Sequence, residues 1–525
     1  MVVGNIESRA HSARPVVCMR SVSALSSLFF MLSLAHTASA QESASSGVQG
    51  SDPVAATTLP AIQISADSQV APDDNINDPY RVAGVSKTGT ALKDLPVSVQ
   101  VIPRALLTEQ GATMLRQSVS NASGVNVGGE DSKGFFDHFE IRGLNAQVYN
   151  DGFSDGDQLN GVSHSLNGVE SIEILEGPGS ALFGSGPPGG TINIVHFTPS
   201  PTFHFGGNIQ AGSFGTVSTN DYVTGPTGIA GLNYRVDALA SRADGFRGLS
   251  SWDKEIRPAL QWKLGDHKID FSLDARDMRQ TPDSYGLIYY HGSPITNVPI
   301  DSKYSTPFAY ARGNYIRPTL TDQWRVNEFL TINNRFSYLH RSLDFLSNSD
   351  TPATQVSDDE VIRRQLRHQT DSDNTFDYQL EPVWRFATGS VGHTLLTGFE
   401  YQHQTINTVR ATADLPNIPD AFAPVPPETS LAGLTFQCGP THSCDNDHLL
   451  ANFYSLYATD QVDVTDKLKI RAGVRKDWWD TSLTPNITVP GRFDLEGQPL
   501  VAGATYRRDD APVSWNVGVL YKLLP

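Results

Sequence analysis

From Phe203 onward, apolar and polar residues alternate with a period of two over long stretches. The alternation is clear in residues 268–276 (KIDFSLDAR), 468–475 (LKIRAGVR) and 515–522 (WNVGVLYK). A period of two places apolar side chains on one face of a β-strand and polar side chains on the other. The pattern predicts roughly twelve such strands between Phe203 and Lys522.

The connections between these strands are of two kinds. Short turns, such as residues 265–266 and 465–467, alternate with long irregular stretches at about 281–307, 348–360 and 408–450. A soluble β-sandwich would also alternate, but it would not need such heavily charged polar positions. Charged polar positions, aromatic residues near strand ends and this asymmetry of the turns are typical of a transmembrane β-barrel with a wet lumen.

Residues 81–199 follow a mixed pattern instead. Residues 97–101 alternate as in a strand, and residues 106–119 carry apolar side chains at helical spacing. Residues 168–199, GVESIEILEGPGSALFGSGPPGGTINIVHFTP, are predicted to form a strand, a glycine-rich turn and a second strand. The turn contains G-x-G-x-x-G, but a strand follows it, and a dinucleotide site needs a helix there. A compact α+β domain without a dinucleotide is therefore expected.

Residues 1–40 are typical of a secretory signal peptide. Three arginines precede an apolar segment at about 25–35, and Ala38-Ser39-Ala40 forms an A-x-A cleavage site. The sequence leaves open whether Met1 or Met19 is the true start. Residues 41–80 are rich in small and polar residues, which predicts a flexible linker. No run of 18 apolar residues occurs, so no transmembrane helix is expected, but hydropathy does not detect short β-strands.

The composition and the motifs of the chain argue against several classes of function. The formal net charge of −17 argues against nucleic-acid binding, because that needs a basic surface. Neither a Ser-His-Asp context nor an H-E-x-x-H motif is found, so the protein is not expected to be an enzyme. Once Cys18 leaves with the signal peptide, Cys438 and Cys444 remain, and an even pair in an exported chain predicts a disulfide. A metal site made by both cysteines with His442 is the alternative, but it matches no common ligand spacing, so no metal is expected.

Residues 168–199 resemble the plug-domain signature of TonB-dependent outer-membrane siderophore receptors, nearest to the ferric-hydroxamate (ferrichrome-type) branch. The matching positions are Glu170, Ile172, Glu173, Gly177, Pro178, Leu182, Gly184, Pro188, Gly189, Gly190, Ile192, Asn193, Val195 and Pro199. Ile141-Arg142-Gly143 and Asp151-Gly152 match two further motifs of the plug. The resemblance implies a β protein with a small α+β plug, residues 81–199, inside an antiparallel transmembrane β-barrel, residues 200–525.

The resemblance also implies a function. Such a receptor lies in the bacterial outer membrane and imports ferric siderophore complexes into the periplasm. Its partners would be TonB with the inner-membrane energising complex, the ferric siderophore and outer-membrane lipid, and iron would enter only within the siderophore, so no cofactor is expected. A TonB-box-like segment can add as an edge strand to TonB. Its residues are Leu59, Pro60, Ala61, Ile62, Gln63, Ile64, Ser65 and Ala66.

The family resemblance places ligand contacts at the outer apices of the plug. The corresponding residues here are Lys133, Phe135, Phe136, Gln147, Tyr149, Phe153 and Gln158. Members of the family often hold the plug with two plug arginines that face carboxylates of the barrel. Arg142 supplies one of them, whereas Glu176 replaces the other. Either a cation of the barrel compensates for Glu176, or that lock is missing.

The number of strands raises a question about completeness. Plugged barrels of this kind have about 22 strands, and about twelve strands would enclose too little room for a plug. Only about twelve are expected here, and the sequence stops just after a strand without a terminal aromatic residue. We therefore expect the N-terminal part of a receptor that is truncated at its C-terminus. The alternatives are a non-functional truncated receptor, a passive porin, and a receptor for another chelate, such as cobalamin, nickel or sugar.

The signal peptide gives the first testable prediction. We expect signal peptidase to cleave after Ala40, so that the mature protein begins at Gln41. N-terminal sequencing of protein from an outer-membrane fraction measures this directly. An unprocessed chain in the cytoplasm would contradict export.

Overall fold

The computed structural model describes residues 81–523 of the chain. Within this range it leaves out residues 83, 121, 129–136, 157–160, 178, 185, 187, 283–288, 292, 349–354, 357–360, 440–441 and 495–496. The signal peptide, the TonB-box-like segment and four of the expected ligand contacts (Lys133, Phe135, Phe136 and Gln158) therefore lie outside the described residues.

The N-terminal domain, which we call the plug, is built on a seven-stranded sheet with the order β1-β6-β7-β4-β3-β2, in which β5 pairs with β4. Its elements are η1(Gly84–Ser86), η2(Leu92–Asp94), β1(Val99–Pro103), α2(Arg104–Glu109), α3(Leu115–Val119), β2(Val125–Gly128), β3(His138–Ile141), β4(Leu144–Asn150), β5(Phe153–Ser154), β6(Val169–Glu176), α4(Ser180–Phe183) and β7(Gly190–His196). Apolar side chains from α2, α3 and the central strands fill its core. Ile172, Ile174 and Ile192 are completely buried there, which is why the β-branched runs of residues 168–199 form two neighbouring interior strands, β6 and β7.

The glycine-rich turn between β6 and β7 depends on close backbone contacts. The amide of Gly189 donates to the carbonyl of Asn145, and its own carbonyl accepts from the amide of Gly177. A Cβ at Gly189 would overlap the carbonyl oxygens of Leu144 and Asn145. Only glycine fits at this position, because β4 passes directly beside the turn.

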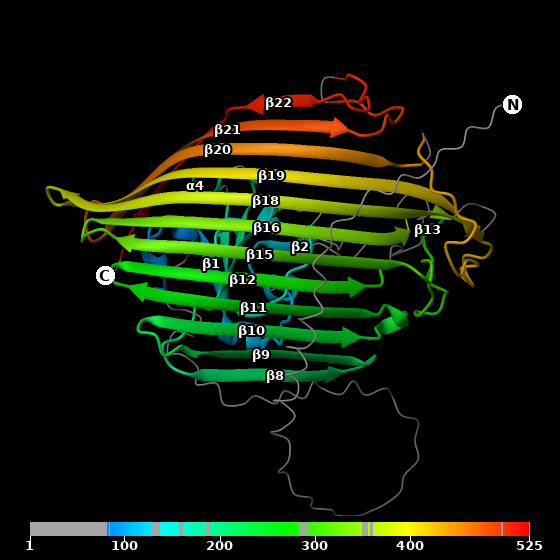
Figure 1. Ribbon diagram of the computed structural model, residues 1–525, viewed down its shortest axis with the longest axis horizontal. Helices are drawn as coiled ribbons and strands as arrows, with labels where there is room; N and C mark the ends of the chain where they lie inside the picture. Colours follow the sequence, from blue (N-terminus) through cyan, green and yellow to red (C-terminus); the bar gives the residue numbers. More distant parts are fainter. Residues whose placement is uncertain are drawn as a thin grey trace, which may run out of the picture. The chain divides into compact units, whose positions relative to one another are not determined.

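The C-terminal domain, which we call the wall, is one large antiparallel sheet (Figure 1). Its strands are β8(His204–Gly212), β9(Thr216–Pro226), β10(Leu232–Ala243), β11(Ser251–Leu264), β12(His267–Gln280), β15(Tyr310–Arg325), β16(Leu330–Asn348), β18(Ile362–Thr388), β19(Val391–Ile418), β20(Asp445–Asp463), β21(Leu468–Pro485), β22(Tyr506–Asp510) and β23(Val513–Tyr521). Both β22 and β23 pair with β21, so these 13 strands occupy twelve places along the sheet. The expected strand number is therefore confirmed for the described residues.

The wall is polar on the plug side and apolar on the other. Along β18, Asp373, Asp377 and Glu381 are buried, whereas the alternating Trp384 and Phe386 are about 40% exposed. Large exposed apolar side chains on one whole face of a sheet need an apolar solvent. This reversal of the usual arrangement agrees with a lipid-facing barrel wall.

An aromatic row crosses the exposed face of the wall. Phe336, Tyr378, Tyr401, Tyr454 and Trp478 stand opposite one another on five successive strands. A row of aromatic side chains on the exposed face is typical of the girdles that flank the apolar band of a membrane barrel.

The long connections all leave one end of the sheet, and they contain more regular structure than expected. β19 extends to Ile418 and β20 begins at Asp445, so much of the expected loop 408–450 belongs to strands. The correction has a simple cause, because residues 408–418 continue the backbone pairing of β19 with β18. The other two loops contain β13(Tyr289–Tyr290), β14(Ser293–Pro294) and β17(Gln355–Val356), which form a small third sheet.

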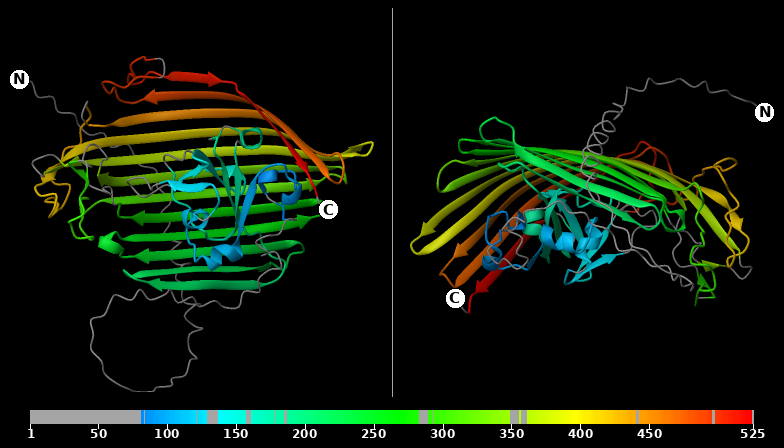
Figure 2. Two further views of the ribbon diagram at one scale, coloured as in Figure 1. Left: turned by 180° about the vertical axis from the view of Figure 1, so that it is seen from behind. Right: turned by 90° about the horizontal axis from the view of Figure 1, so that it is seen from below.

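The plug lies against the concave, polar face of the curved wall (Figure 2). Tyr149, Leu182 and Phe183 of the plug join Val383, Leu396 and Tyr457 of the wall in one buried apolar cluster. No helix in the part of the chain that the structure describes is long and apolar enough to cross a membrane.

Replacement of Gly189 by alanine tests the turn between β6 and β7. We expect Gly189→Ala to destabilise the plug by about 1–3 kcal/mol, because the new methyl group must push β4 away. The matched control is Gly186→Ala in the same turn, where the nearest atom to an added Cβ is 4.0 Å away. Limited proteolysis of both variants measures the effect, and equal cleavage rates would contradict it.

Candidate functional site: the plug–wall interface and the outer loops

The expected contact between Arg142 and the barrel is not found among the described residues. Arg142 forms an ion pair of 2.5 Å with Glu176, and both residues belong to the plug. The Arg142 side chain is 58% exposed. The pKa of the Glu176 carboxyl lies below its usual value, because hydrogen bonds from Gln100 and Arg142 and the charge of Arg142 outweigh burial. Arg142 itself therefore compensates for Glu176 within the plug.

The actual contacts have the opposite polarity, with cations on the wall and acceptors on the plug. Arg317 of β15 and Arg341 of β16 both form ion pairs with Asp155 of the plug, and Arg341 also pairs with Asp373 of the wall at 2.8 Å. All four side chains are at most 7% exposed. Buried ion pairs of this kind are costly to break, because each partner is then left charged without a solvent shell.

Asp155 is the centre of this cluster. Its carboxylate also lies 3.0 Å from Nε2 of His164 and accepts a hydrogen bond from Asn150. Burial alone would raise the pKa of Asp155, but Arg317, His164 and Arg341 hold it well below its usual range. Asp155 is therefore charged at neutral pH, as a partner for two guanidinium groups must be.

A second contact holds the turn at Asp151-Gly152. Arg257 of β11 lies 3.3 Å from the Asp151 carboxylate, and Arg335 of β16 donates to the Asp151 carbonyl. The Arg335 guanidinium also lies 4.5 Å from the centre of the Phe153 ring. Within the plug, His196 pairs with Asp151 at 2.9 Å. The turn that sequence analysis noted as a family motif is thus a docking point for wall arginines.

The first residues of the plug are held by the wall as well. Lys87 forms a buried ion pair of 2.7 Å with Glu381 of β18. Arg471 of β21 donates to the Ser86 carbonyl at 2.8 Å and to the Thr88 hydroxyl at 3.1 Å. On the plug side, the Glu173 carboxylate accepts from the amides of Gly84 and Val85. The segment 84–88 therefore lies between plug and wall and is bound to both.

Three expected ligand contacts lie within the described residues. Tyr149 and Phe153 are 4% and 1% exposed, and both pack at the plug–wall interface. The expectation that they lie on outward apices is wrong, because their rings complete apolar contacts inside the molecule. Gln147 is partly buried, and its side chain donates to the Gly156 carbonyl at 3.3 Å.

The outer loops are held firmly to the strand ends. A buried ion pair of 2.6 Å joins Arg364 of β18 to Glu428 of the loop between β19 and β20. Arg364 also donates to the carbonyl of Tyr304, which lies in the loop between β12 and β15. The Tyr304 hydroxyl in turn donates to the Ala421 carbonyl. Two loops that are far apart in the sequence are thus joined through one arginine.

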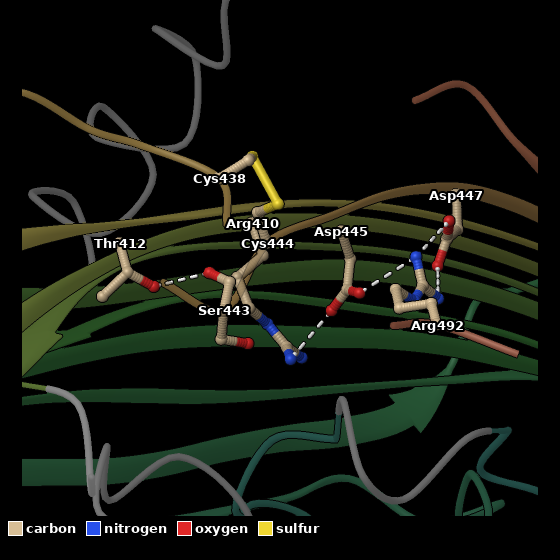
Figure 3. The surroundings of a disulfide bond; sticks show 8 residues. All are labelled: Arg410, Thr412, Cys438, Ser443, Cys444, Asp445, Asp447 and Arg492. Carbon is tan, nitrogen blue, oxygen red and sulfur yellow. Dashed lines mark hydrogen bonds and ion pairs between the residues drawn. A yellow bond between two sulfur atoms is a disulfide. The ribbon is translucent and has the colours of Figure 1, made fainter. Parts of the chain in front are cut away.

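The structure joins Cys438 to Cys444 in a disulfide at the base of the same loop, with the two Cα atoms 5.3 Å apart (Figure 3). Beside it, Arg410 and Arg492 both pair with Asp445, and Arg492 also pairs with Asp447 (Figure 3). Arg492 comes from the loop between β21 and β22, so this charge cluster connects that loop to the ends of β19 and β20. Within the described ranges, no group of three or more His, Cys, Asp or Glu side chains could hold a metal ion.

A small α+β plug bound by buried ion pairs to the polar face of a lipid-type β-wall defines the class of plugged β-barrel membrane proteins. The family profile described as TonB-dependent receptor plug domain matches residues 91–191, and the profile of the TonB-dependent receptor-like β-barrel matches residues 257–525. The chain therefore belongs to the TonB-dependent receptor family, whose members are transport receptors.

Individual relatives agree with this assignment. The metal-pseudopaline receptor of Pseudomonas aeruginosa is 26% identical over 461 residues, which are 85% of this chain and 61% of the relative. The ferrioxamine B receptor of Salmonella typhimurium is 25% identical over 65% of this chain and 50% of its own length. The chain thus spans about half to three fifths of these relatives.

Solved structures show the same fold. The open form of the ferric-catecholate import receptor Fiu from E. coli superposes with a TM-score of 0.70 at 20% identity, over 83% of this chain and 69% of that one. The siderophore receptor PiuA from Acinetobacter baumannii gives a TM-score of 0.71 at 19% identity, over 84% of this chain and 64% of that one.

Sequence reasoning missed the wall arginines that hold the plug. The period-two pattern identified the polar face of the wall, but not which of its charges meet the plug. One signal was available, because Arg317, Arg335 and Arg341 share the strand face that carries the buried polar residues. Pairing them with Asp151 and Asp155 required the tertiary structure.

Substitution of Asp155 tests the buried cluster. We expect Asp155→Asn to destabilise plug docking by about 3–5 kcal/mol, because Arg317 loses its buried counter-charge. The matched control is Asp277→Asn, whose partner Arg312 is 53% exposed, and its expected cost is at most about 1 kcal/mol. Urea midpoints of the purified variants measure both.

The same substitution should show a defined pH dependence. The pKa of Asp155 is depressed in the folded state, so its contribution is fully present above the unfolded value near 4. It is lost only as the pH falls toward the lower folded value. The gap between wild type and Asp155→Asn should therefore be constant between about pH 5 and pH 8 and shrink in stronger acid. A gap that closes near neutral pH would contradict the assignment.

Proposed function

We propose that this protein is an outer-membrane receptor that imports ferric siderophore complexes with energy from TonB. The observation that carries the proposal is the plug docked by buried ion pairs on the polar face of the wall. A plug in this position blocks free diffusion through the lumen. Transport then requires that the plug be moved. The partner that moves it is TonB, after which the receptor family is named.

The proposed mechanism is mechanical. TonB pairs with residues 59–66 by strand addition, in which backbone hydrogen bonds supply the affinity. Force on this segment reaches the plug at residues 84–88, which are bound to Glu173, Glu381 and Arg471. The protein makes no covalent change to its cargo, so we propose no enzymatic activity and no resident cofactor.

The chelate is proposed to bind between the plug apices and the outer loops. Lys133, Phe135, Phe136, Gln147 and Gln158 remain the proposed plug contacts. Tyr149 and Phe153 are withdrawn from this set, because both are buried against the wall. The loop between β19 and β20 forms a prearranged side of the site, since the Arg364–Glu428 ion pair and the disulfide restrict it at two points.

A second candidate cargo is a chelate of a metal other than iron. It is supported by the name of one relative, the metal-pseudopaline receptor, which is 26% identical to this chain. A passive porin is disfavoured, because it would need an open lumen. The ion pairs of Asp151, Asp155 and Lys87 with the wall hold the plug in place instead.

Uptake of radioactive iron tests the function and its coupling. We expect a full-length version of this receptor, expressed in a host without siderophore receptors, to take up ferrichrome-bound or ferrioxamine-bound iron only when TonB is present. Ile62→Pro should reduce this uptake at least tenfold while surface binding persists, because proline removes a backbone donor and bends the strand.

The control for this variant is Ala56→Pro, upstream of the TonB-box-like segment, which should leave uptake unchanged. Uptake in a host without TonB would favour the porin. Full uptake by Ile62→Pro would eliminate residues 59–66 as the coupling strand.

A further inference from the structure

A cavity of about 370 Å³ lies between the plug and the wall, near the end of the sheet that carries the short turns. The plug contributes the turn at 151–152, Asn193 and residues 195–199 to its lining. The wall contributes polar side chains from β12, β15 and β16, namely Lys268, Asp270, Ser272, Thr319, Thr321, Asp322, Gln323, Asn333 and Arg335. A cavity of this size, at the lower end of the range of ligand pockets, holds a small organic ligand.

Arg257 is the exceptional residue in this lining. It is 94% buried, since only 6% of its surface is exposed. Its Nη2 atom lies 3.3 Å from the Asp151 carboxylate, which is a long contact for an ion pair. Its Nη1 atom has no hydrogen-bond partner among the residues that the structure describes. A buried guanidinium nitrogen without an acceptor is unfavourable, so the position suits an acceptor oxygen, which water or a ligand can supply.

The other cations around the cavity are already neutralised. Lys87 pairs with Glu381 at 2.7 Å, and Arg335 lies 4.0 Å from the same carboxylate. His196 shares Asp151 with Arg257. Lys268 lies 3.7 Å from the Asp270 carboxylate. The Nη1 donor of Arg257, which has no partner among the described residues, therefore distinguishes this cavity from other polar cavities between plug and wall.

We propose that this cavity is a binding site for a carboxylate-bearing, oxygen-rich ligand, with Arg257 as its principal contact. A guanidinium group offers two parallel N–H donors that match a carboxylate, and the cavity's hydroxyl and amide side chains can bind further oxygens. Binding would compete with Asp151 for the same guanidinium, so occupancy weakens one contact that holds the plug. The use of the site as a stop on the import route rests on the proposed function, whereas the site itself does not.

Calorimetric titration of the purified protein with citrate tests the site. Citrate is the probe because it is a small tricarboxylate, and sodium chloride at equal ionic strength is the reference titrant. We expect saturable binding of citrate and a loss of affinity of at least tenfold in Arg257→Gln. The control Arg312→Gln removes an exposed arginine of the wall and should bind citrate as the wild type does.

A double variant separates ligand binding from plug loosening. Arg257→Gln with Asp151→Asn removes both charges of the contact, so neither partner is left buried without its counter-charge. Weak citrate binding in the double variant supports Arg257 as the ligand contact. Restored binding would mean that Arg257 acts only by holding the plug, and would overturn the proposal.

Two further outcomes would also overturn it, namely no saturable binding by the wild type and unchanged binding by Arg257→Gln. The result is independent of transport, because the titration measures no uptake. Citrate binding without TonB-dependent uptake would refute the proposed function and leave the site standing. TonB-dependent uptake without citrate binding would refute the site and leave the proposed function standing.

Discussion

The arrangement of this molecule depends on arginines of the wall that are buried against acceptors of the plug. Arg317 and Arg341 hold Asp155, and Arg257 and Arg335 hold Asp151. In such an interface the attraction between charges largely offsets the cost of removing them from water, so the net gain is small. Breaking a single pair is expensive nevertheless, because the remaining charge stays buried. The contacts thus oppose local loosening of the plug, which would break one ion pair at a time. Separation of the whole plug from the wall costs less free energy per contact, because water then reaches all the charges together.

The same charges explain why plug and wall need each other. The inner face of β18 alone carries Asp373, Asp377 and Glu381, all buried. Without the plug this face would be wet, and without the wall the plug's Asp155 would lose both guanidinium partners. On the other face, exposed side chains such as Trp384 and Phe386 fit an apolar solvent. β18 and β19, with 27 and 28 residues, exceed the roughly ten residues that span a bilayer, so they also carry the outer loops.

The sequence predicted the class of protein and the elements of the plug, but not which side chains meet at the plug–wall interface. The plug signature in residues 168–199 located the neighbouring strands β6 and β7 of the plug, and the Cys438–Cys444 pair is joined as its spacing suggested. Arg142 was assigned to the wrong partner because motif matching cannot show that Glu176 lies beside it. Tyr149 and Phe153 were placed outside because aromatic residues in a loop-like stretch have no local signal of burial. Their burial is set by Val383, Tyr457 and Arg335, which follow more than 180 residues later.

The sequence by itself determined the alternation of the wall strands, the asymmetry of their turns and the strand–turn–strand unit of the plug. These features are local: a period of two defines a strand face, and a glycine beside a backbone carbonyl defines a turn. Only the tertiary structure decided which charges meet, because Asp151 and Asp155 find their partners on strands β11, β15 and β16, far along the chain. It also decided that Arg257 keeps one nitrogen without a protein partner among the described residues. Such contacts depend on the register of the wall strands, the curvature of the sheet and the position of the plug against it. None of these three is encoded in the residue spacing of a single segment.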